Sequence, residues 1–333
     1  MVSLNGWLIT LLVLSFILVV FMYIGPHSGK EAFSQGAPYV IQRGTNAYDD
    51  FYAGIYDILY KSNERSEYEA QQIVLATQPD KEFSRFLDIG CGTGCLTATI
   101  QKLGYQVIGV DKSQAMIQAG TEKRPECTLK QGDTQDSMTF DRGAFTHILC
   151  LNGTIYELKD KIAFFRNCAH WLEPGGYLVL HLMDPKKFNP IVPVGNNYGD
   201  PVGKSYGDPV GKSYGDPVGK HSSDPVGKSR QYDSPQEFSK SRITNSVVDF
   251  IDFKYKSVYD FEQVDTTGQV VQIETFTDAM TNKVRQNEHT LYMEKERDIL
   301  AMTQFCGFVA VGSFTMERYN KDAFQTVHIL QKL

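Results

Sequence analysis

The sequence predicts a doubly wound α/β fold with a mostly parallel sheet, and two observations carry this prediction. Short apolar segments typical of buried strands alternate with helical segments from residue 83 to residue 185, an order that places helices on both faces of a parallel sheet. A glycine-rich run, LDIGCGTG at residues 87–94, joins the first strand of this series to its first helix. With 42% hydrophobic and 12% aromatic residues among 333, the chain also has enough apolar material for a sizeable core.

The expected elements of this series follow one another at short intervals. Strands are expected at residues 86–89, 107–110, 128–130, 145–151 and 177–182, and helices at residues 96–103, 115–119 and 161–171. The last helix should stop before Pro174, which is followed by two glycines and cannot continue it. Beyond the series, residues 247–261, 270–277 and 283–289 are β-rich, and a helix is expected at residues 295–304. Two final strands, residues 308–317 and 324–331, flank a tight turn and must therefore be antiparallel.

An aromatic-rich segment precedes the series. Its tyrosines stand four residues apart, a spacing that lines one face of a helix: Tyr48, Tyr52, Tyr56 and Tyr60. Most of these rings are expected to pack on the core, and one or two of them to close over a ligand.

The N-terminal run at residues 7–24 contains no charged residue and is almost wholly apolar. Its length matches the roughly 18 to 20 apolar residues of a bilayer-spanning helix, and Trp7 and Tyr23 stand near its ends, where aromatic rings favour the interface. A cleaved signal peptide is the alternative, although no basic residue precedes the run. We expect a single-pass membrane anchor with the bulk of the chain in the cytosol, because Lys30 and Arg43 follow the run.

Residues 197–229 are an internal repeat with a period of eight, built on the unit YGDPVGKS. Glycine, proline and aspartate in every unit oppose helix and strand, so we expect an expanded loop. The run GDPVGKS resembles a phosphate-binding loop but is one residue short, and no strand precedes it. The resulting organisation is an anchor at 1–25, a linker at 26–47, a core at 48–185, the repeat loop at 186–232, a β-rich insertion at 233–290 and a last helix with a hairpin at 291–333.

Charge and cysteine usage exclude several classes of function. The net charge is −6 and no stripe of lysine and arginine is present, so direct binding of nucleic acid is not expected. The six cysteines are scattered, which favours a reducing compartment over a disulfide framework. Cys91 and Cys95 have no second pair of cysteine or histidine to complete a zinc site, so no metal is expected.

The glycine-rich run has the chemistry of a ligand-binding turn. Alternate glycines after a buried strand let the backbone approach a ligand, and the following helix offers its N-terminus. The spacing is GxGxG rather than GxGxxG and Asp88 precedes it, which argues against a nicotinamide dehydrogenase. Asp111 ends the next strand, where a carboxylate can accept hydrogen bonds from both hydroxyls of a ribose.

These motifs resemble the class I S-adenosylmethionine (SAM)-dependent methyltransferases. LDIGCGTG matches the first motif of the family and VIGVD the second, and the segment WLEPGGYLVLHLMD is similar to its helix, turn and fifth strand. The final hairpin resembles the antiparallel sixth and seventh strands of the family. The resemblance implies a Rossmann-like seven-stranded sheet, SAM as cofactor, and a β-rich insertion that roofs the active site, as in small-molecule methyltransferases such as sugar-amine N-methylating enzymes.

The resemblance also implies roles for individual residues. Asp88, Gly90, Gly92 and Gly94 would surround the methionine part of SAM, and Asp111 would hold the ribose. Asp133 and Thr134 would contact the adenine, and Tyr52 or Tyr56 would fold over the cofactor. Asn152 and Tyr156 would face the methyl group. The sequon at Asn152 lies inside this motif, so we do not expect it to be glycosylated.

Methyl transfer in the family is a direct in-line displacement, for which the protein supplies orientation and a dry site. An amine acceptor needs only to lose a proton, whereas a hydroxyl acceptor requires a general base. His181 and Asp184, at the end of the fifth strand, are the candidate bases, although for His181 a purely structural role as a strand-end histidine is slightly favoured. The sequence predicts a membrane-anchored methyltransferase acting on a nitrogen or oxygen of a small molecule. A binding or scaffold protein without turnover and, less favoured, an NAD-linked oxidoreductase are the alternatives.

Overall fold

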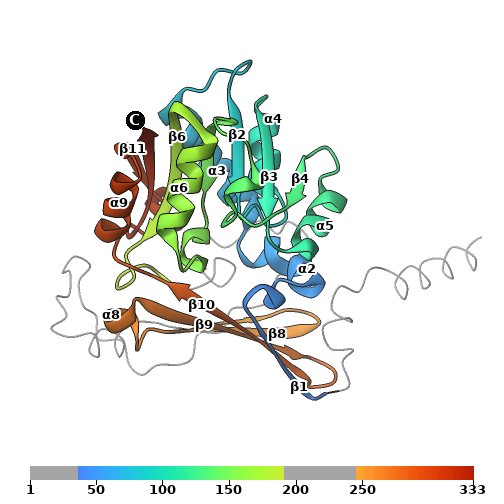
Figure 1. The fold of residues 1–333 in the computed structure, drawn as a ribbon. Helices are drawn as coiled ribbons and strands as arrows, with labels where there is room; N and C mark the ends of the chain where they lie inside the picture. Colours follow the sequence, from blue (N-terminus) through green and yellow to red (C-terminus); the bar gives the residue numbers. More distant parts are fainter. Residues whose placement is uncertain (1–36, 191–244) are drawn as a thin grey trace, which may run out of the picture.

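The structure is a computed structural model that describes residues 37–190 and 245–333 (Figure 1). The expected membrane anchor at residues 7–24 and the octapeptide repeats at residues 197–229 lie outside the described residues. Within the described ranges, none of the helices combines the length and the apolar character that crossing a bilayer requires.

The larger sheet has seven strands in the order β11-β12-β6-β5-β2-β3-β4. Their bounds are β2 Arg85–Ile89, β3 Gln106–Asp111, β4 Leu129–Gln131, β5 Phe145–Cys150, β6 Leu172–Met183, β11 Phe308–Thr315 and β12 Gln325–Lys332. Strands β2 to β6 pair in parallel, and β12 runs antiparallel to both β6 and β11. The predicted mostly parallel sheet and antiparallel hairpin are confirmed. Strand order reverses beside β2, which is where ligands bind in doubly wound folds.

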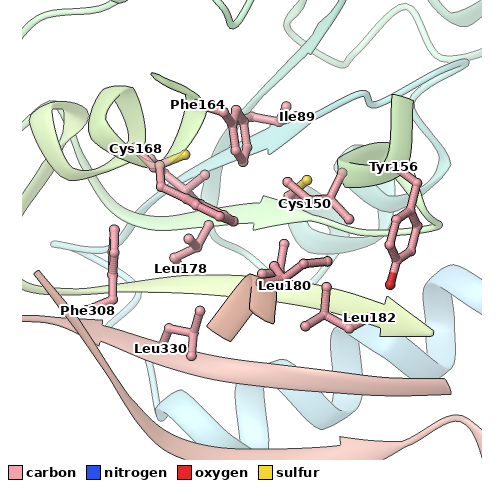
Figure 2. Packing of buried hydrophobic residues seen from close by; sticks show 14 of the residues in the cluster. Ile89, Cys150, Tyr156, Phe164, Cys168, Leu178, Leu180, Leu182, Phe308 and Leu330 are labelled. Carbon is pink, nitrogen blue, oxygen red and sulfur yellow. The ribbon is translucent and has the colours of Figure 1, made fainter. Parts of the chain in front are cut away.

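Helices cover both faces of this sheet, because successive side chains along each strand point alternately to one face and to the other. Ile148 and Cys150 pack in the cluster formed with α6 (Lys161–Trp171) and α9 (Glu296–Phe305), as Figure 2 shows for its central residues. Leu149 and Leu151 point to the opposite face, in the cluster that α3 (Ser62–Thr77) and α4 (Cys95–Lys102) cover. This period of two is the pattern of strands buried on both sides.

Two of the core helices begin at side-chain caps that the sequence supplies. Asp160 accepts a hydrogen bond from the Ala163 amide (2.9 Å) at the start of α6. Ser113 does the same for the Met116 amide (3.1 Å) at the start of α5 (Gln114–Lys123). Each cap satisfies a backbone donor that the helix itself leaves unpaired.

A second sheet of five strands, which we call the roof, lies across the ends of the first (Figure 1). Its strands, in spatial order, are β1 Tyr39–Arg43, β10 Val284–Tyr292, β9 Gln269–Asp278, β8 Phe253–Asp260 and β7 Asn245–Asp249. All neighbours are antiparallel except β1 and β10. Helix α2 (Asp50–Leu59) lies between the two sheets, and its buried face packs on Phe253, Tyr255 and Phe276 of the roof. The short helix α8 (Val264–Thr267) joins β8 to β9.

Three elements differ from the sequence prediction. Strand β1 lies inside the segment predicted as a linker, because pairing with β10 stabilises five residues that have no strong strand pattern of their own. Helix α3 was not predicted; its buried face carries Arg65, Ser66 and Glu69, so it lacks the apolar stripe that marks a helix. Strand β6 begins directly after α6 and includes Pro174, which is tolerated beside the register shift between Phe145 and His147.

Candidate active site between the sheet and the roof

A cavity of about 430 Å³ lies between the carboxyl ends of the parallel strands and the roof. It is lined from below by residues that follow β2, β3, β4 and β5, and from above by His289 and Thr290 of β10. Short 3-10 turns close its sides: η1 (Gly44–Ala47) and η3 (Thr154–Glu157). The volume is that of a small-molecule site, and it stands where doubly wound sheets bind ligands.

The glycine turn after β2 forms part of the cavity floor. Gly90 has a φ of +66°, and a Cβ placed there would lie 2.5 Å from Cγ2 of Thr154. Both the backbone conformation and the lack of space therefore require glycine at this position. Gly92 also lines the cavity, whereas Gly94 caps α4 and does not. The backbone amides of Gly90 and Cys91 are both bonded to the carbonyl of Val110, which fixes the turn against β3.

Asp111 borders the cavity with two hydrogen bonds already made. Its Oδ2 accepts from the Gly92 amide (2.9 Å) and its Oδ1 from the Ser113 amide (2.8 Å). Each carboxylate oxygen keeps a second lone pair, so both can still accept from a diol. Burial raises the pKa of Asp111, and these backbone hydrogen bonds oppose that effect. The geometry therefore suits a neutral diol such as a ribose.

A smaller hollow adjoins the cavity and shares Tyr56, Gly90 and Asn152 with it. Its walls include Arg65 of α3 and Asp88 of β2. Arg65 is buried and pairs with Glu69 (Nε to Oε1, 2.9 Å). Burial raises the pKa of Asp88 to about 7, against the hydrogen bond that it accepts from the Thr97 hydroxyl (2.7 Å). Arg65 is a functional candidate that the sequence analysis missed, and it is the group here that suits an amino-acid carboxylate.

The far end of the cavity is polar and lies after β4. Asp133 and Thr134 line it, together with Gln135. Lys112 pairs with Asp133 (2.9 Å), and this contact lowers the pKa of that carboxyl. The Nε2 atom of Gln135 is buried with no hydrogen-bond partner among the described residues, so a donor is left for a ligand with an acceptor nitrogen.

Two of the four tyrosines reach the cavity. Tyr48 and Tyr56 line it, while Tyr52, one of the two expected to cover the cofactor, is buried between the rings of Tyr48, Tyr56 and His289. Asn152 donates to the Tyr56 hydroxyl (2.8 Å), which joins the end of β5 to α2. The ring that can cover a ligand over Gly92 is therefore Tyr56, whose Cε1 lies 3.5 Å from where a Cβ on Gly92 would be.

The expected catalytic residues His181, Asp184 and Tyr156 do not line this cavity. His181 is buried within β6 and its Nδ1 accepts from Arg65 (3.3 Å), so burial and that positive charge hold the pKa of His181 well below its usual range. The Tyr156 hydroxyl is occupied by the backbone of Met183. Asp184 caps the following turn through the Lys186 amide. Strand β6 extends past His181 to Met183, so the histidine is not at a strand end and it faces α3.

The roof side of the cavity carries ionisable groups that the sequence analysis did not identify. His289 of β10 lines it, and Glu157 of η3 lines the adjoining side of the cavity, where its Oε1 accepts from the Tyr48 hydroxyl (2.5 Å). Nε2 of His289 lies 2.9 Å from Oε2 of Glu274 on the neighbouring strand. No group of three or more potential metal ligands is found within residues 37–190 and 245–333, and Cys91 and Cys95 are free thiols.

Comparison with known proteins identifies the part of the chain that forms the floor. Residues 86–176 match the family model described as a methyltransferase domain. The cypemycin N-terminal methyltransferase of Streptomyces sp. is 34% identical over 107 residues, covering 31% of this chain and 43% of that protein. The ubiquinone biosynthesis O-methyltransferase of Xanthomonas oryzae pv. oryzae is 29% identical over 105 residues, covering 30% and 44%. The chain thus spans less than half the length of these curated relatives.

Solved structures extend the likeness to most of the chain. A SAM-dependent methyltransferase from Clostridium acetobutylicum has a TM-score of 0.55 at 16% identity, covering 84% of this chain and 97% of that one. The CcbJ methyltransferase of Streptomyces caelestis has a TM-score of 0.55 at 16% identity, covering 86% and 98%. At these identities the likeness shows the fold. Together the findings support a methyltransferase domain on the fold of the SAM-dependent methyltransferases, with SAM as the cofactor.

Proposed function

We propose that this chain, with its class I methyltransferase fold, transfers a methyl group from SAM to a nucleophile of a small molecule. The observation that carries the proposal is one continuous cavity, about 430 Å³ in volume, that joins the glycine turn and Asp111 on its floor to His289 of the roof. A roof over the carboxyl ends of the strands leaves space for a small acceptor rather than for a macromolecular surface. When bound, SAM supplies an electrophilic methyl group.

The residues on the floor fit SAM by their chemistry. Asp111 keeps two free lone pairs for the ribose hydroxyls, and Gln135 has an unpartnered amide nitrogen at the polar end of the cavity. The Arg65 guanidinium suits the carboxylate of the methionine part, in the hollow beneath Tyr56. Asp88 does not reach the open cavity, so its role is to order the turn through Thr97.

The chain contributes to transfer mainly by orientation and by excluding water. Tyr56 covers the glycine turn and is held by Asn152, so the ring limits the positions open to a ligand. Roof strand β10 covers the cavity from above through His289 and Thr290 and limits the access of bulk solvent to the reacting atoms. Orientation of two reactants in a dry site is the main source of rate enhancement in a displacement that forms no bond to the protein.

The test is calorimetric titration with SAM, followed by transfer of a labelled methyl group to a small-molecule extract of the source cells. In the variant Asp111→Asn, SAM binding should weaken by about 1.5 to 3 kcal/mol, roughly tenfold to 150-fold, because a charge-assisted contact is lost. Glu122→Gln is the matched control, since Glu122 is an exposed carboxylate of α5 that does not line the cavity. Undiminished binding by Asp111→Asn would refute the site. Binding without transfer would leave the scaffold alternative.

We also propose that residues 7–24 anchor the enzyme in a membrane, with the described residues on the cytosolic side. The support is the length of this charge-free run and the position of the first basic residues after it. Carbonate extraction should leave the full chain in the membrane fraction, and N-terminal sequencing should find the run intact. A mature chain beginning near Gly25 would refute the anchor. Protease protection of residues 37–333 inside sealed secretory vesicles would refute only the orientation.

A further inference from the structure

The inner face of the roof carries polar side chains that are almost wholly buried. Those of β9 and β10 are Gln272, Glu274, Arg285, Asn287 and His289. Arg285 and Asn287 have a structural task, because both donate to the carbonyl of Ala47 and Arg285 also pairs with Asp49 (2.6 Å). Among the described residues, the side chains of Glu274 and His289 hydrogen-bond only to each other and to Tyr255, all within the roof, so they do not fasten the roof to another element. Burial of ionisable groups without a structural task is typical of functional sites.

Glu274 and His289 form an oriented pair. The Glu274 side chain is fully buried; one oxygen lies 2.9 Å from Nε2 of His289, and the other accepts from the Tyr255 hydroxyl (2.6 Å). Because a carboxylate can only accept, Nε2 of His289 carries the hydrogen and Nδ1 carries the lone pair. Within the described part of the chain no group bonds to Nδ1, and the imidazole borders the cavity.

The pair lies above the segment that follows β5. His289 lines the same cavity as Gly90, Asn152 and Glu157, and η3 contacts β10. The ring of Tyr48 packs against the imidazole with centroids 5.1 Å apart. The imidazole of the roof and the end of β5 on the floor therefore border the same cavity.

We propose that His289, oriented by Glu274, is the general base of the reaction and that the methyl acceptor is a hydroxyl compound. The inference rests on the proposed function and decides between the two nucleophiles that it leaves open. The acceptor oxygen uses a lone pair to form the new bond to the methyl carbon as the carbon–sulfur bond breaks, and that electron pair stays on sulfur as a neutral thioether. The O–H proton passes to Nδ1, and Glu274 pairs with the resulting imidazolium.

The surrounding charges support this role. Burial lowers the pKa of His289, but the hydrogen bond and charge of Glu274 and the charge of Glu157 outweigh it, so the pKa is raised. Arg285 opposes them, and the rings of Tyr48 and Tyr52 complete the surroundings of the imidazole. A hydroxyl has to give up its proton to a base as the methyl group is transferred, whereas an amine that is already neutral reacts through its free lone pair. The oriented pair of His289 and Glu274 therefore favours a hydroxyl acceptor.

The experiment uses SAM with a labelled methyl group and a small-molecule extract of the source cells, with mass spectrometry of the product. The label should reside on oxygen. His289→Gln should lower kcat by about 10² to 10⁴-fold while the Kd for SAM changes less than twofold. Glu274→Gln should lower kcat and move the acidic limb of the pH profile to lower pH, because the carboxylate that raises the pKa of His289 is gone. Gln286→Ala, on the outer face of β10, is the control and should match the parent.

Label on nitrogen, or an unchanged kcat in His289→Gln, would overturn the proposal and leave the proposed function intact. A parent chain that binds SAM and labels nothing would overturn the proposed function itself. If His289→Gln does not fold, nitrogen NMR of ¹⁵N-histidine in the parent chain decides instead. A proton on Nε2 with a raised pKa supports the base, and a proton on Nδ1 in the neutral ring overturns it.

Discussion

The floor and the roof line the same cavity, but they hold their functional side chains in different ways. On the floor, functional groups follow the ends of strands and are held by backbone hydrogen bonds, as the two amides bonded to Asp111 show. On the roof, they project from the middle of strands and are held by other side chains, as Glu274 holds His289. The groups on the floor are therefore fixed by local backbone geometry, whereas those on the roof depend on which side chains two neighbouring strands place side by side.

The largest effect is expected from the contacts of Arg285 that attach the roof to the segment before α2. Arg285→Met should lower the free energy of unfolding by about 3 kcal/mol, because it removes a buried guanidinium that joins β10 to Asp49 and Ala47. Arg43→Met is the matched control, since that arginine pairs with Glu288 at the exposed roof edge and should cost less than about 1 kcal/mol. Urea unfolding measures both. Equal costs would mean that the buried contact does not fasten the roof.

On the floor, Asp88 gives a prediction about pH. Its pKa is raised to about 7 in the folded chain, so folding favours the protonated form. The stability from this group is complete below pH 4 and is lost as pH rises through about 7, with a slope of at most about 1.4 kcal/mol per pH unit. Asp88→Asn should therefore flatten the decline in unfolding free energy between pH 4 and 7.

Asp133→Asn is the control for that measurement. The hydrogen bond from Lys112 lowers the pKa of Asp133, so its contribution is lost only as pH falls below the unfolded value. If the parent and Asp88→Asn show parallel stability curves from pH 4 to 7, Asp88 is ionised in the folded chain and the assignment is wrong.

The smallest effect is expected from the chain that connects floor to roof between β6 and β7. Deletion of residues 198–220, most of the repeats, should change the unfolding free energy by only about 0.5 kcal/mol, because loop closure depends weakly on length. SAM affinity should stay the same. A marked drop in melting temperature would show that the repeats pack on one of the two halves.

Most of the floor could be predicted from sequence, because its signals are local. A buried strand, a glycine turn and Asp111 at the end of the next strand stand close together in the chain, and each follows from backbone geometry. Arg65 was not identified as a site residue, because the buried face of α3 is polar and does not mark a helix in the sequence. The structure places Arg65 in the hollow beside Asp88. His181 was expected at the cavity because it stands near the end of β6, but its side chain is buried on the face that α3 covers, where it meets Arg65.

The pair formed by Glu274 and His289 on the roof could not be predicted from the sequence, for a physical reason. Strand alternation reveals a buried face only when one phase is apolar. In β10 both phases are polar: Arg285, Asn287 and His289 point inward, and Gln286 and Glu288 point outward. The pairing of His289 with Glu274 also depends on the register between β9 and β10, in which Glu274 lies opposite Asn287 and diagonal to the histidine. The sequence carries no local mark of that register.

The pairing of β1 with β10 sets an order of assembly during synthesis. Tyr39 and Gln286, joined by a side-chain hydrogen bond, stand 247 positions apart in the chain. A chain made from its N-terminus holds β1 without its partner strand until most of the protein has emerged, and contacts this distant are slow to form. Strands β2 to β6 lie within residues 85–183 and can pair long before that. The five parallel strands can thus pair on the ribosome, whereas the roof closes only after β10 has been made, and β11 and β12 complete the larger sheet last.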